Sequence, residues 1–247
     1  MPLRRVVLAS ASPARLALLR NAGIHPEVVV SGVDESGVDH LPVPQAAVAL
    51  AERKADAVVA TLAGGVAGDA GAPLVVGCDS MLSIDGTVRG KPSSLDEGRT
   101  WLRAWRGRSG VLVTGQCVVD AATGRRAAAA VETEVRYGDP SDAELEAYLA
   151  TGEPLHVAGA FTLDGFSAPF VAGVHGDPGG VIGLSLPLLR TLLARLDIAI
   201  TDLWTTSAVT AAGTATAAGT ATAAGAPPNG RGDPGQAGRR VVAPEAP

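Results

Sequence analysis

The stretch VVLASASPARLALL, Val6–Leu19, passes from a strand pattern to a helix pattern within a few residues. Residues 5–9 (RVVLA) are typical of a short buried strand. Residues 14–22 (ARLALLRNA) carry leucines at helical spacing, and Gly23 supplies a common signal for a helix C-terminus. Pro13 suits the first position of that helix. A strand that turns directly into a helix is typical of α/β proteins, so we predict that class.

The turn between this strand and this helix is suited to binding an anion. Ala9, Ser10, Ala11 and Ser12 are small, so a ligand can approach the backbone closely. The first amide groups of a helix lack partners within the helix and point toward whatever precedes it. The hydroxyls of Ser10 and Ser12 add donors, and Arg15 adds a positive charge on the first helical turn. The same pattern also fits an ordinary serine-capped helix, so the turn alone establishes no function.

The elements predicted after this turn mix strands and helices without strict alternation, which favours a mixed twisted sheet with flanking helices. Strands are predicted at residues 27–31, 74–78, 110–121 and 127–137, with an Asp85-Gly86 hairpin turn. Helices are predicted at residues 45–61, from Ser93 or Ser94 to 106, from 141 to 149, and after Pro187. We expect one domain over residues 1–204.

Two segments have compositions that do not favour a packed core. Residues 63–73 (AGGVAGDAGAP) are rich in Gly and Ala, and we predict a flexible surface insertion there. Residues 205–247 contain the hexamer GTATAA twice and then mostly Pro, Gly and charged residues, so we predict a disordered low-complexity tail.

Composition excludes several classes of function. The net charge is −5, and no basic tract is present, so we expect no nucleic-acid partner. The 2 cysteines are too few for a disulfide framework, and the 4 histidines show no close ligand spacing. No apolar run reaches the roughly 20 residues that a membrane-spanning helix needs. We therefore expect a cytoplasmic protein with no membrane association and no signal peptide.

Acidic and basic residues at separate points of the chain suggest chemistry on a phosphate chain. Asp79 follows the apolar residues 74–78, and a carboxylate at the carboxyl end of such a strand faces the ligand crevice of open α/β sheets. Of the 20 basic residues only Lys54 and Lys91 are lysines. Lys54 lies on a predicted helix near an acidic loop containing Glu35, and Lys91 lies on the bend Gly90-Lys91-Pro92.

These residues together suit a metal-dependent reaction on a phosphoanhydride, in which cations bind phosphates and carboxylates hold the metal and orient water. The segment 156–165 (HVAGAFTLDG), with Asp164 near its end, forms either one wall of a base pocket or simply a strand and turn. A Rossmann oxidoreductase is disfavoured because no GxGxxG follows the first strand, and no GxSxG supports Ser-His-Asp catalysis.

The order and spacing of these motifs resemble the Maf family of nucleotide pyrophosphatases over residues 7–196. The matching segments are LASASPARLALLRNAGI, VDE at 33–35, AERKA at 51–55, GCDS at 77–80, GKP at 90–92, TEVRY at 133–137, TGEP at 151–154, AGAF at 158–161 and GLSLPLL at 183–189. The resemblance implies an α/β fold with a cleft between two lobes, as in the house-cleaning inosine triphosphatases. It also implies hydrolysis of a nucleoside triphosphate to the monophosphate and pyrophosphate with Mg²⁺ or Mn²⁺, and a homodimer.

The resemblance also implies roles for individual residues. Asp79 corresponds to the family's catalytic acid/base residue and, with Glu35, would bind the metal. The substrate-binding residues would be Ser10, Ser12, Arg15, Lys54, Lys91 and Asp164. The two isolated lysines both fall on family positions.

Three positions depart from the family pattern. Ala14 stands where many members have an arginine, and Val157 stands where a lysine often precedes AGAF. Asp164 replaces the Gln of the branch that prefers dTTP and UTP. An ionised Asp only accepts hydrogen bonds, whereas a Gln also donates them. The branch that prefers 7-methyl-GTP is acidic at this position, so a cationic methylated guanine is the hypothesis for the base.

Two alternatives stay open on the sequence alone. One is a pyrophosphatase of broad specificity that acts on several canonical or modified triphosphates. The other is a nucleotide-binding regulator linked to cell division with little or no hydrolysis; the absence of an arginine at Ala14 allows it, and the presence of Asp79, Lys54 and Lys91 argues against it.

Overall fold

The computed structural model describes residues 4–64 and 71–205. The strands of this part are β1 (Val6–Ala9), β2 (Glu27–Val28), β3 (Leu74–Ile84), β4 (Thr87–Arg89), β5 (Ser109–Asp120), β6 (Arg126–Tyr137) and β7 (Val171–His175). The α-helices are α1 (Pro13–Asn21), α2 (Val43–Gly64), α3 (Leu95–Trp105), α4 (Asp142–Ala150), α5 (Pro178–Ile182) and α6 (Leu186–Ala194). Short 3₁₀ helices occupy Glu153–His156, Ala158–Ala160, Ala168–Phe170 and Ile200–Leu203.

The strands form one mixed 7-stranded sheet, as the sequence predicts. Its order is β2-β1-β3-β5-β6-β7, and β4 pairs with β3 off this path. β1 runs parallel to both β2 and β3, whereas the pairs β3–β5, β5–β6 and β6–β7 are antiparallel. Of the antiparallel pairs, β5 and β6 are joined by the short connection at residues 121–125, which suits neighbouring antiparallel strands, whereas β4 and α3 intervene between β3 and β5.

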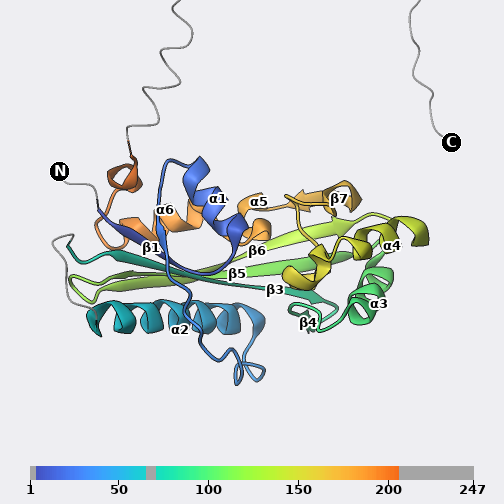
Figure 1. Ribbon diagram of the computed structural model, residues 1–247, viewed down its shortest axis with the longest axis horizontal. Helices are drawn as coiled ribbons and strands as arrows, with labels where there is room; N and C mark the ends of the chain where they lie inside the picture. The colour runs from blue at the N-terminus through green and yellow to red at the C-terminus, as the bar shows by residue number, and fades with distance from the viewer. Residues whose placement is uncertain (1–3, 65–70, 206–247) are drawn as a thin grey trace, which may run out of the picture. The chain divides into compact units, whose positions relative to one another are not determined.

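Helix α2 covers one face of the sheet at very short range (Figure 1). Two glycines permit this approach, Gly77 on β3 and Gly115 on β5. A Cβ on Gly77 would lie 2.2 Å from the carbonyl oxygen of Ala51, and one on Gly115 would lie 2.2 Å from that of Ala47. Because no side chain separates helix from sheet at these points, the residues of α2 that follow are held close to β3.

We expect the substitution Gly77→Ala to lower the free energy of unfolding by at least about 1–3 kcal/mol, because the added methyl group overlaps a helix backbone that has no room to move. Denaturant titration measures this loss. Gly173→Ala is a matched control, since Gly173 also lies in a strand but nothing stands within 4 Å of the place that an added Cβ would take. An equal loss in both variants would contradict the close-packing explanation.

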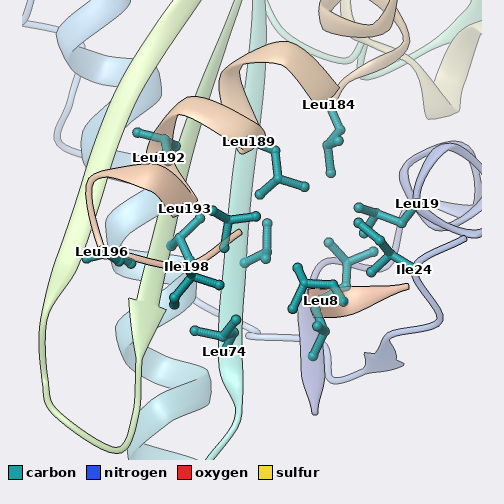
Figure 2. Close-up of a cluster of buried hydrophobic side chains, with 14 of the residues drawn as sticks. Leu8, Leu19, Ile24, Leu74, Leu184, Leu189, Leu192, Leu193, Leu196 and Ile198 are labelled. Carbon is teal, nitrogen blue, oxygen red and sulfur yellow. The ribbon is translucent and has the colours of Figure 1, made fainter. Parts of the chain in front are cut away.

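The opposite face of the sheet carries two separate hydrophobic clusters. The first packs α1 and α6 against β1 and β3, and Figure 2 shows its leucines, among them Leu8, Leu74 and Leu189, pointing toward one another. The second lies toward the other end of the strands, where Leu82 and Leu112 pack with Trp105 of α3 and with α4. Both clusters lie on the same sheet, and the two lobes that the family resemblance implies stay a prediction.

A row of polar side chains separates the two clusters on this face. Side chains alternate between the faces of a strand, so Ser80 follows Cys78 and precedes Leu82 on β3. Thr114 and Gln116 occupy the same face of β5, opposite Ser80 and Cys78. We call Ser80, Thr114 and Gln116 the polar band. Thr114 and Gln116 are fully buried, so the band interrupts the apolar interior.

Several predicted boundaries shift in the structure. The strand at residues 27–31 is only two residues long, and the last helix begins at Leu186, because the Ser185 hydroxyl accepts from the Leu188 amide and caps it. Residues 156–165 form 3₁₀ helices and turns rather than a strand. The paired strands, the Asp85-Gly86 hairpin and the helices beginning after Ser94 and Ser141 are confirmed.

The prediction for β3 is wrong in one respect that matters for function. β3 does not end before Asp79 but continues to Ile84. The strand persists because its antiparallel partner β5 pairs with it as far as Ser83, although its parallel partner β1 ends at Ala9.

The structure does not describe the predicted tail or most of the predicted insertion. Residues 65–70 of the insertion, and the tail beyond Thr205, lie outside the described residues. Within residues 4–64 and 71–205, no helix combines the length and the hydropathy that crossing a membrane requires.

Candidate active site

The site is built around an interruption in the sheet beside β3. The last β1 residue paired with β3 is Ala9, opposite Gly77. β4 pairs with β3 only from Leu82 onward. Residues 78–81 of β3 therefore have a strand partner on one side, β5, and no strand partner among the described residues on the other. We call this stretch the open edge of β3. Asp79 and Ser80 lie on it with opposite orientations, Asp79 toward α2 and Ser80 toward the polar band.

The predicted anion-binding turn lies at the start of this open edge. Ser10 directly follows β1, and its hydroxyl accepts a hydrogen bond from the Ser12 amide at 3.2 Å. The Ser12 hydroxyl caps α1 by accepting from the Arg15 amide at 3.4 Å, and Pro13 occupies the first helical position. The strand, the turn and the capped helix are all confirmed.

Arg15 extends from α1 to the open edge and connects three parts of the chain. Its Nη1 donates to the Ser10 hydroxyl at 3.0 Å and to the carbonyl oxygen of Cys78 at 2.9 Å. Its Nη2 donates to the Ser80 hydroxyl at 3.0 Å, and its Nε donates to the carbonyl oxygen of Gly183 at 2.8 Å. A guanidinium has five N–H groups, so one remains for a ligand. The charge of Arg15 lies near the turn, but four of its five N–H groups bind other parts of the chain. Arg15 therefore acts mainly as a clamp that holds α1, β3 and Gly183 together.

Asp79, Lys54 and Glu35 meet on the other face of the open edge. The ammonium of Lys54 lies 2.6 Å from a carboxylate oxygen of Asp79 and 2.6 Å from one of Glu35. The Lys54 and Asp79 side chains are 12% and 10% exposed, whereas Glu35 is 59% exposed. α2 carries Lys54, β3 carries Asp79 and the loop before α2 carries Glu35. The predicted proximity of Lys54 to the acidic loop is confirmed.

The electrostatics of this cluster favour proton transfer at Asp79. Burial raises the pKa of Asp79 above that of an ordinary aspartate, and the positive charge of Lys54 opposes this only in part. A carboxylate with a raised pKa binds a proton more strongly, which makes it a better general base near neutral pH. Perturbed carboxylates of this kind are typical of catalytic sites.

The cluster supplies two of the carboxylates that a divalent cation would need. Asp79 and Glu35 converge on one point, which the ammonium of Lys54 occupies. The described residues contain no group of three or more Asp, Glu, His or Cys side chains arranged as a metal site. Mg²⁺ commonly takes one or two carboxylates and completes its shell with substrate phosphates and water. The pair therefore fits a cation shared with a phosphate chain rather than one held by protein alone.

Lys91 lies near the far end of the open edge. β4 runs back along β3, with Arg89 opposite Leu82, and Lys91 follows two residues later. Lys91 is exposed, and the ion pairs among the described residues do not include it. The neighbouring carbonyl of Gly90 accepts a hydrogen bond from the Gly159 amide at 2.8 Å, which brings the AGAF segment alongside this bend.

Asp164 is placed in an exposed turn beyond the AGAF segment. Its carboxylate accepts a hydrogen bond from the Thr162 hydroxyl, and no hydrogen bond or ion pair within the described part of the chain joins it to Asp79 or Lys54. Glu153 holds this turn from outside, because its carboxylate accepts from the amides of Phe166 and Ser167. The segment thus forms a turn anchored beside Lys91, with Asp164 at its surface.

Comparison with known proteins decides the family. A family model described as Maf-like protein matches residues 5–196, which include every site residue described above. The chain belongs to the Maf family. A relative from Streptomyces coelicolor, named nucleoside triphosphate pyrophosphatase, is 56% identical over 203 residues, 82% of this chain and 96% of the relative.

Two further proteins bear the same name. The one from Streptomyces avermitilis is 53% identical over 204 residues, covering 83% of this chain and 96% of the relative. The one from Salinispora tropica is 53% identical over 218 residues, covering 87% of this chain and 94% of the relative. Membership of the Maf family, predicted from the motifs, is confirmed.

In this Maf chain, sequence reasoning missed the residues that hold Arg15 in place. Ser80, Thr114 and Gly183 contact Arg15 directly or through one hydroxyl. A usable signal was present in residues 111–119 (VLVTGQCVV), where Thr114 and Gln116 stand at alternate positions of an otherwise apolar strand. Buried polar side chains at such positions need partners, and therefore point to a polar layer inside the fold.

Proposed function

We propose that this chain hydrolyses nucleoside triphosphates to the monophosphate and pyrophosphate. The observation that carries this proposal is the ion cluster of Asp79, Lys54 and Glu35 at the open edge, beside the capped turn at Ser10–Pro13. One side of the open edge thus presents a carboxylate with a raised pKa, and the other presents hydroxyls and a helix start suited to phosphate. The name of the Streptomyces coelicolor relative supports the same activity.

The triphosphate would be bound between these two groups. The hydroxyls of Ser10 and Ser12, together with the start of α1, supply donors to phosphate oxygens. Lys54 and Lys91 supply positive charge from either end of the open edge. Arg15 orients the turn through Ser10 and has one N–H group left for the substrate. Because Ala14 stands where many family members have an arginine, Arg15 alone supplies this contact from the first turn of α1.

Asp79 would act as the general base. It takes a proton from a water molecule as the water oxygen bonds to the α-phosphorus, and the bond from that phosphorus to the α–β bridging oxygen breaks. Pyrophosphate leaves with the bonding electron pair, and the monophosphate keeps the new oxygen. The Lys54 ammonium holds the Asp79 carboxylate in one orientation at 2.6 Å. Positioned general bases contribute about 10²–10⁴-fold to rate.

A divalent cation, Mg²⁺ or Mn²⁺, is part of this proposal. Glu35 and Asp79 would hold it together with phosphate oxygens. When bound, it would neutralise charge on the phosphate chain and polarise the phosphorus that is attacked. Lys54 contacts the same two carboxylates, so it would share them with the cation.

We propose that the nucleobase of the substrate is recognised near Asp164. Its carboxylate is exposed, and an ionised carboxylate attracts a cationic ring such as 7-methylguanine while offering no donor to thymine or uracil. This proposal is supported by the AGAF segment just before Asp164, because the Gly159 amide donates to the carbonyl of Gly90 beside Lys91. Dimer formation stays a prediction.

Pyrophosphate release from a nucleotide panel tests the function. We expect the wild-type chain to release pyrophosphate from at least one of dTTP, UTP, CTP and 7-methyl-GTP, and to need Mg²⁺ or Mn²⁺ for it. Turnover highest with 7-methyl-GTP supports the role of Asp164, whereas a clear dTTP preference contradicts it. Tight nucleotide binding without release of pyrophosphate from any member would instead favour the regulator alternative.

A further inference from the structure

The polar band contains a chain of hydrogen bonds that begins at Arg15 and ends in the backbone of α5. Nη2 of Arg15 donates to the Ser80 hydroxyl at 3.0 Å. The Ser80 and Thr114 hydroxyl oxygens lie 2.8 Å apart, and the Thr114 hydroxyl donates to the carbonyl oxygen of Gly180 at 2.7 Å. Thr114 has no exposed surface.

The directions of these hydrogen bonds are determined by chemistry. The carbonyl of Gly180 can only accept, so the single hydrogen of Thr114 points to it. Thr114 must therefore accept from Ser80, whose own hydrogen is used in that bond. Ser80 in turn can only accept from Arg15, which has no acceptor. The chain runs one way, Arg15 to Ser80 to Thr114 to Gly180, and every hydroxyl has one orientation.

The two ends of this chain are also joined by a second route. Arg15 donates through Nε to the carbonyl of Gly183, which lies just after α5. Arg15 and Thr114 thus bind the α5 segment at two points, at Gly183 just after the helix and at Gly180 within it. Gly180 is closely packed, because a Cβ there would lie 3.0 Å from the side chain of Val131. The guanidinium is therefore oriented by two routes that both end in the α5 segment.

We propose that Thr114 is a positioning residue of this site: through Ser80 and Gly180 it sets the orientation of the Arg15 guanidinium, and so the place of Ser10 relative to Asp79. Thr114 touches no substrate itself. This inference rests on the proposed function, because it assigns Thr114 to the binding of the triphosphate chain.

A neighbouring residue provides a matched control. Thr133 lies on β6, is 1% exposed, and donates its hydroxyl to the carbonyl oxygen of Asp177 at 3.1 Å, just before α5. Thr114 and Thr133 are thus both buried threonines that hold the α5 segment by a hydroxyl-to-carbonyl bond. Of the two, Thr114 alone is also linked to Arg15.

The experiment compares Thr114→Val with Thr133→Val. Valine keeps the shape of threonine and removes the hydroxyl, so both variants should lose thermal stability to a similar extent. We expect Thr114→Val to lower kcat/KM about tenfold or more, since small misplacements of binding groups have large effects on rate. The kcat/KM of Thr133→Val should stay within about twofold of the wild type. Thr114→Ser keeps the hydroxyl and should therefore avoid most of the loss in kcat/KM.

A second variant, Ser80→Ala, tests the proposal even if Thr114→Val does not fold. Ser80→Ala breaks the same chain on the half-buried side while leaving the Thr114–Gly180 bond in place. It should show the same loss as Thr114→Val, and the double variant should lose little more, because residues that act through one another are not additive. Wild-type kinetics in Ser80→Ala would overturn the proposal, as would equal kcat/KM in Thr114→Val and Thr133→Val.

Binding calorimetry with the α,β-methylene analogues of 7-methyl-GTP and dTTP separates this inference from the proposed function. If the wild type binds an analogue but hydrolyses no triphosphate, the proposed function fails, and weaker binding in Thr114→Val alone still supports the positioning role. If the wild type hydrolyses triphosphates and the two threonine variants behave alike, only the positioning role fails. Neither binding nor hydrolysis by the wild type would overturn both.

Discussion

Replacing Asp79 by asparagine is expected to lower kcat for pyrophosphate release by about 10²–10⁴-fold, the usual contribution of a positioned general base. Asparagine has nearly the same shape and can still accept from the ammonium of Lys54, but it cannot take a proton from water. The loss should appear in kcat more than in KM, because phosphate binding depends mainly on other groups. Initial rates with saturating nucleotide and Mg²⁺ measure it.

The stability of this variant distinguishes a catalytic role from a structural one. Burial raises the pKa of Asp79 in the folded chain above its value in the unfolded chain. The ionisation of Asp79 therefore reduces the free energy of unfolding as the pH rises from the unfolded pKa through the folded pKa. At pH 7 the uncharged Asp79→Asn should therefore be no less stable than the wild type. A clear drop in melting temperature together with the loss of activity would contradict the assignment.

Asp120→Asn is the matched control for Asp79→Asn. Asp120 is also a mostly buried carboxylate on the sheet, and it pairs with Arg4 at 3.0 Å. Burial raises the pKa of Asp120, but the hydrogen bonds from Ala122 and Arg4 together lower it by more. The net shift of this pKa is therefore downward. Its charge therefore stabilises the fold. Asp120→Asn should lose stability and keep its activity, the reverse of Asp79→Asn.

The second large effect is expected for Lys54→Met. This change removes the cation that contacts both Asp79 and Glu35, and it leaves the Asp79 carboxylate buried without that close positive charge. We expect kcat/KM to fall by about 10²-fold or more, because the carboxylate loses its orientation and the triphosphate loses a charge partner. The pH–rate profile supplies a more specific readout.

The direction of the pH effect follows from the charge of Lys54. Its ammonium lowers the pKa of Asp79 against the effect of burial, so removing it raises that pKa further. A general base works only when deprotonated, and the acidic limb of the kcat profile should consequently move to higher pH. A profile that keeps its acidic limb at the wild-type position would show that Asp79 is not the titrating base.

Arg53→Met serves as the control for Lys54→Met. Arg53 is the preceding residue on α2, is exposed, and donates to the carbonyl of Ser36 in the same loop as Glu35 at 2.8 Å. Its replacement removes a cation and a loop contact of similar kind but leaves Lys54 in place. We expect kcat/KM within about threefold of the wild type, since exposed charge contacts contribute little.

Much of this site was accessible from the sequence because its residues lie in short local patterns. The strand, the serine cap and the proline at the first helical position can all be predicted from neighbouring residues within Val6–Leu19. The antiparallel part of the sheet also follows from local signals, since Asp85-Gly86 and the strand patterns on either side of residues 122–126 predict the two hairpins. The ordered motifs then identified the family, which the match over residues 5–196 confirms.

What only the tertiary structure decided concerns contacts between residues far apart in the chain. The position of Asp79 within a strand, rather than at its end, depends on the unequal lengths of β1 and β5 as its neighbours. The clamp of Arg15 on Cys78, Ser80 and Gly183 joins segments separated by up to 168 residues. A sequence pattern reports burial and local conformation, but not which strand ends first or which donor meets which acceptor.

The opening stretch illustrates this division. Val6–Leu19 by itself determines a strand, a turn and a helix, because each depends on backbone preferences and capping within a few residues. Whether Arg15 binds phosphate directly or clamps the fold depends on acceptors on β3 and beyond α5, which packing alone brings within reach. Hydrogen bonds act over about 3 Å, so their partners are decided only when the whole sheet is assembled.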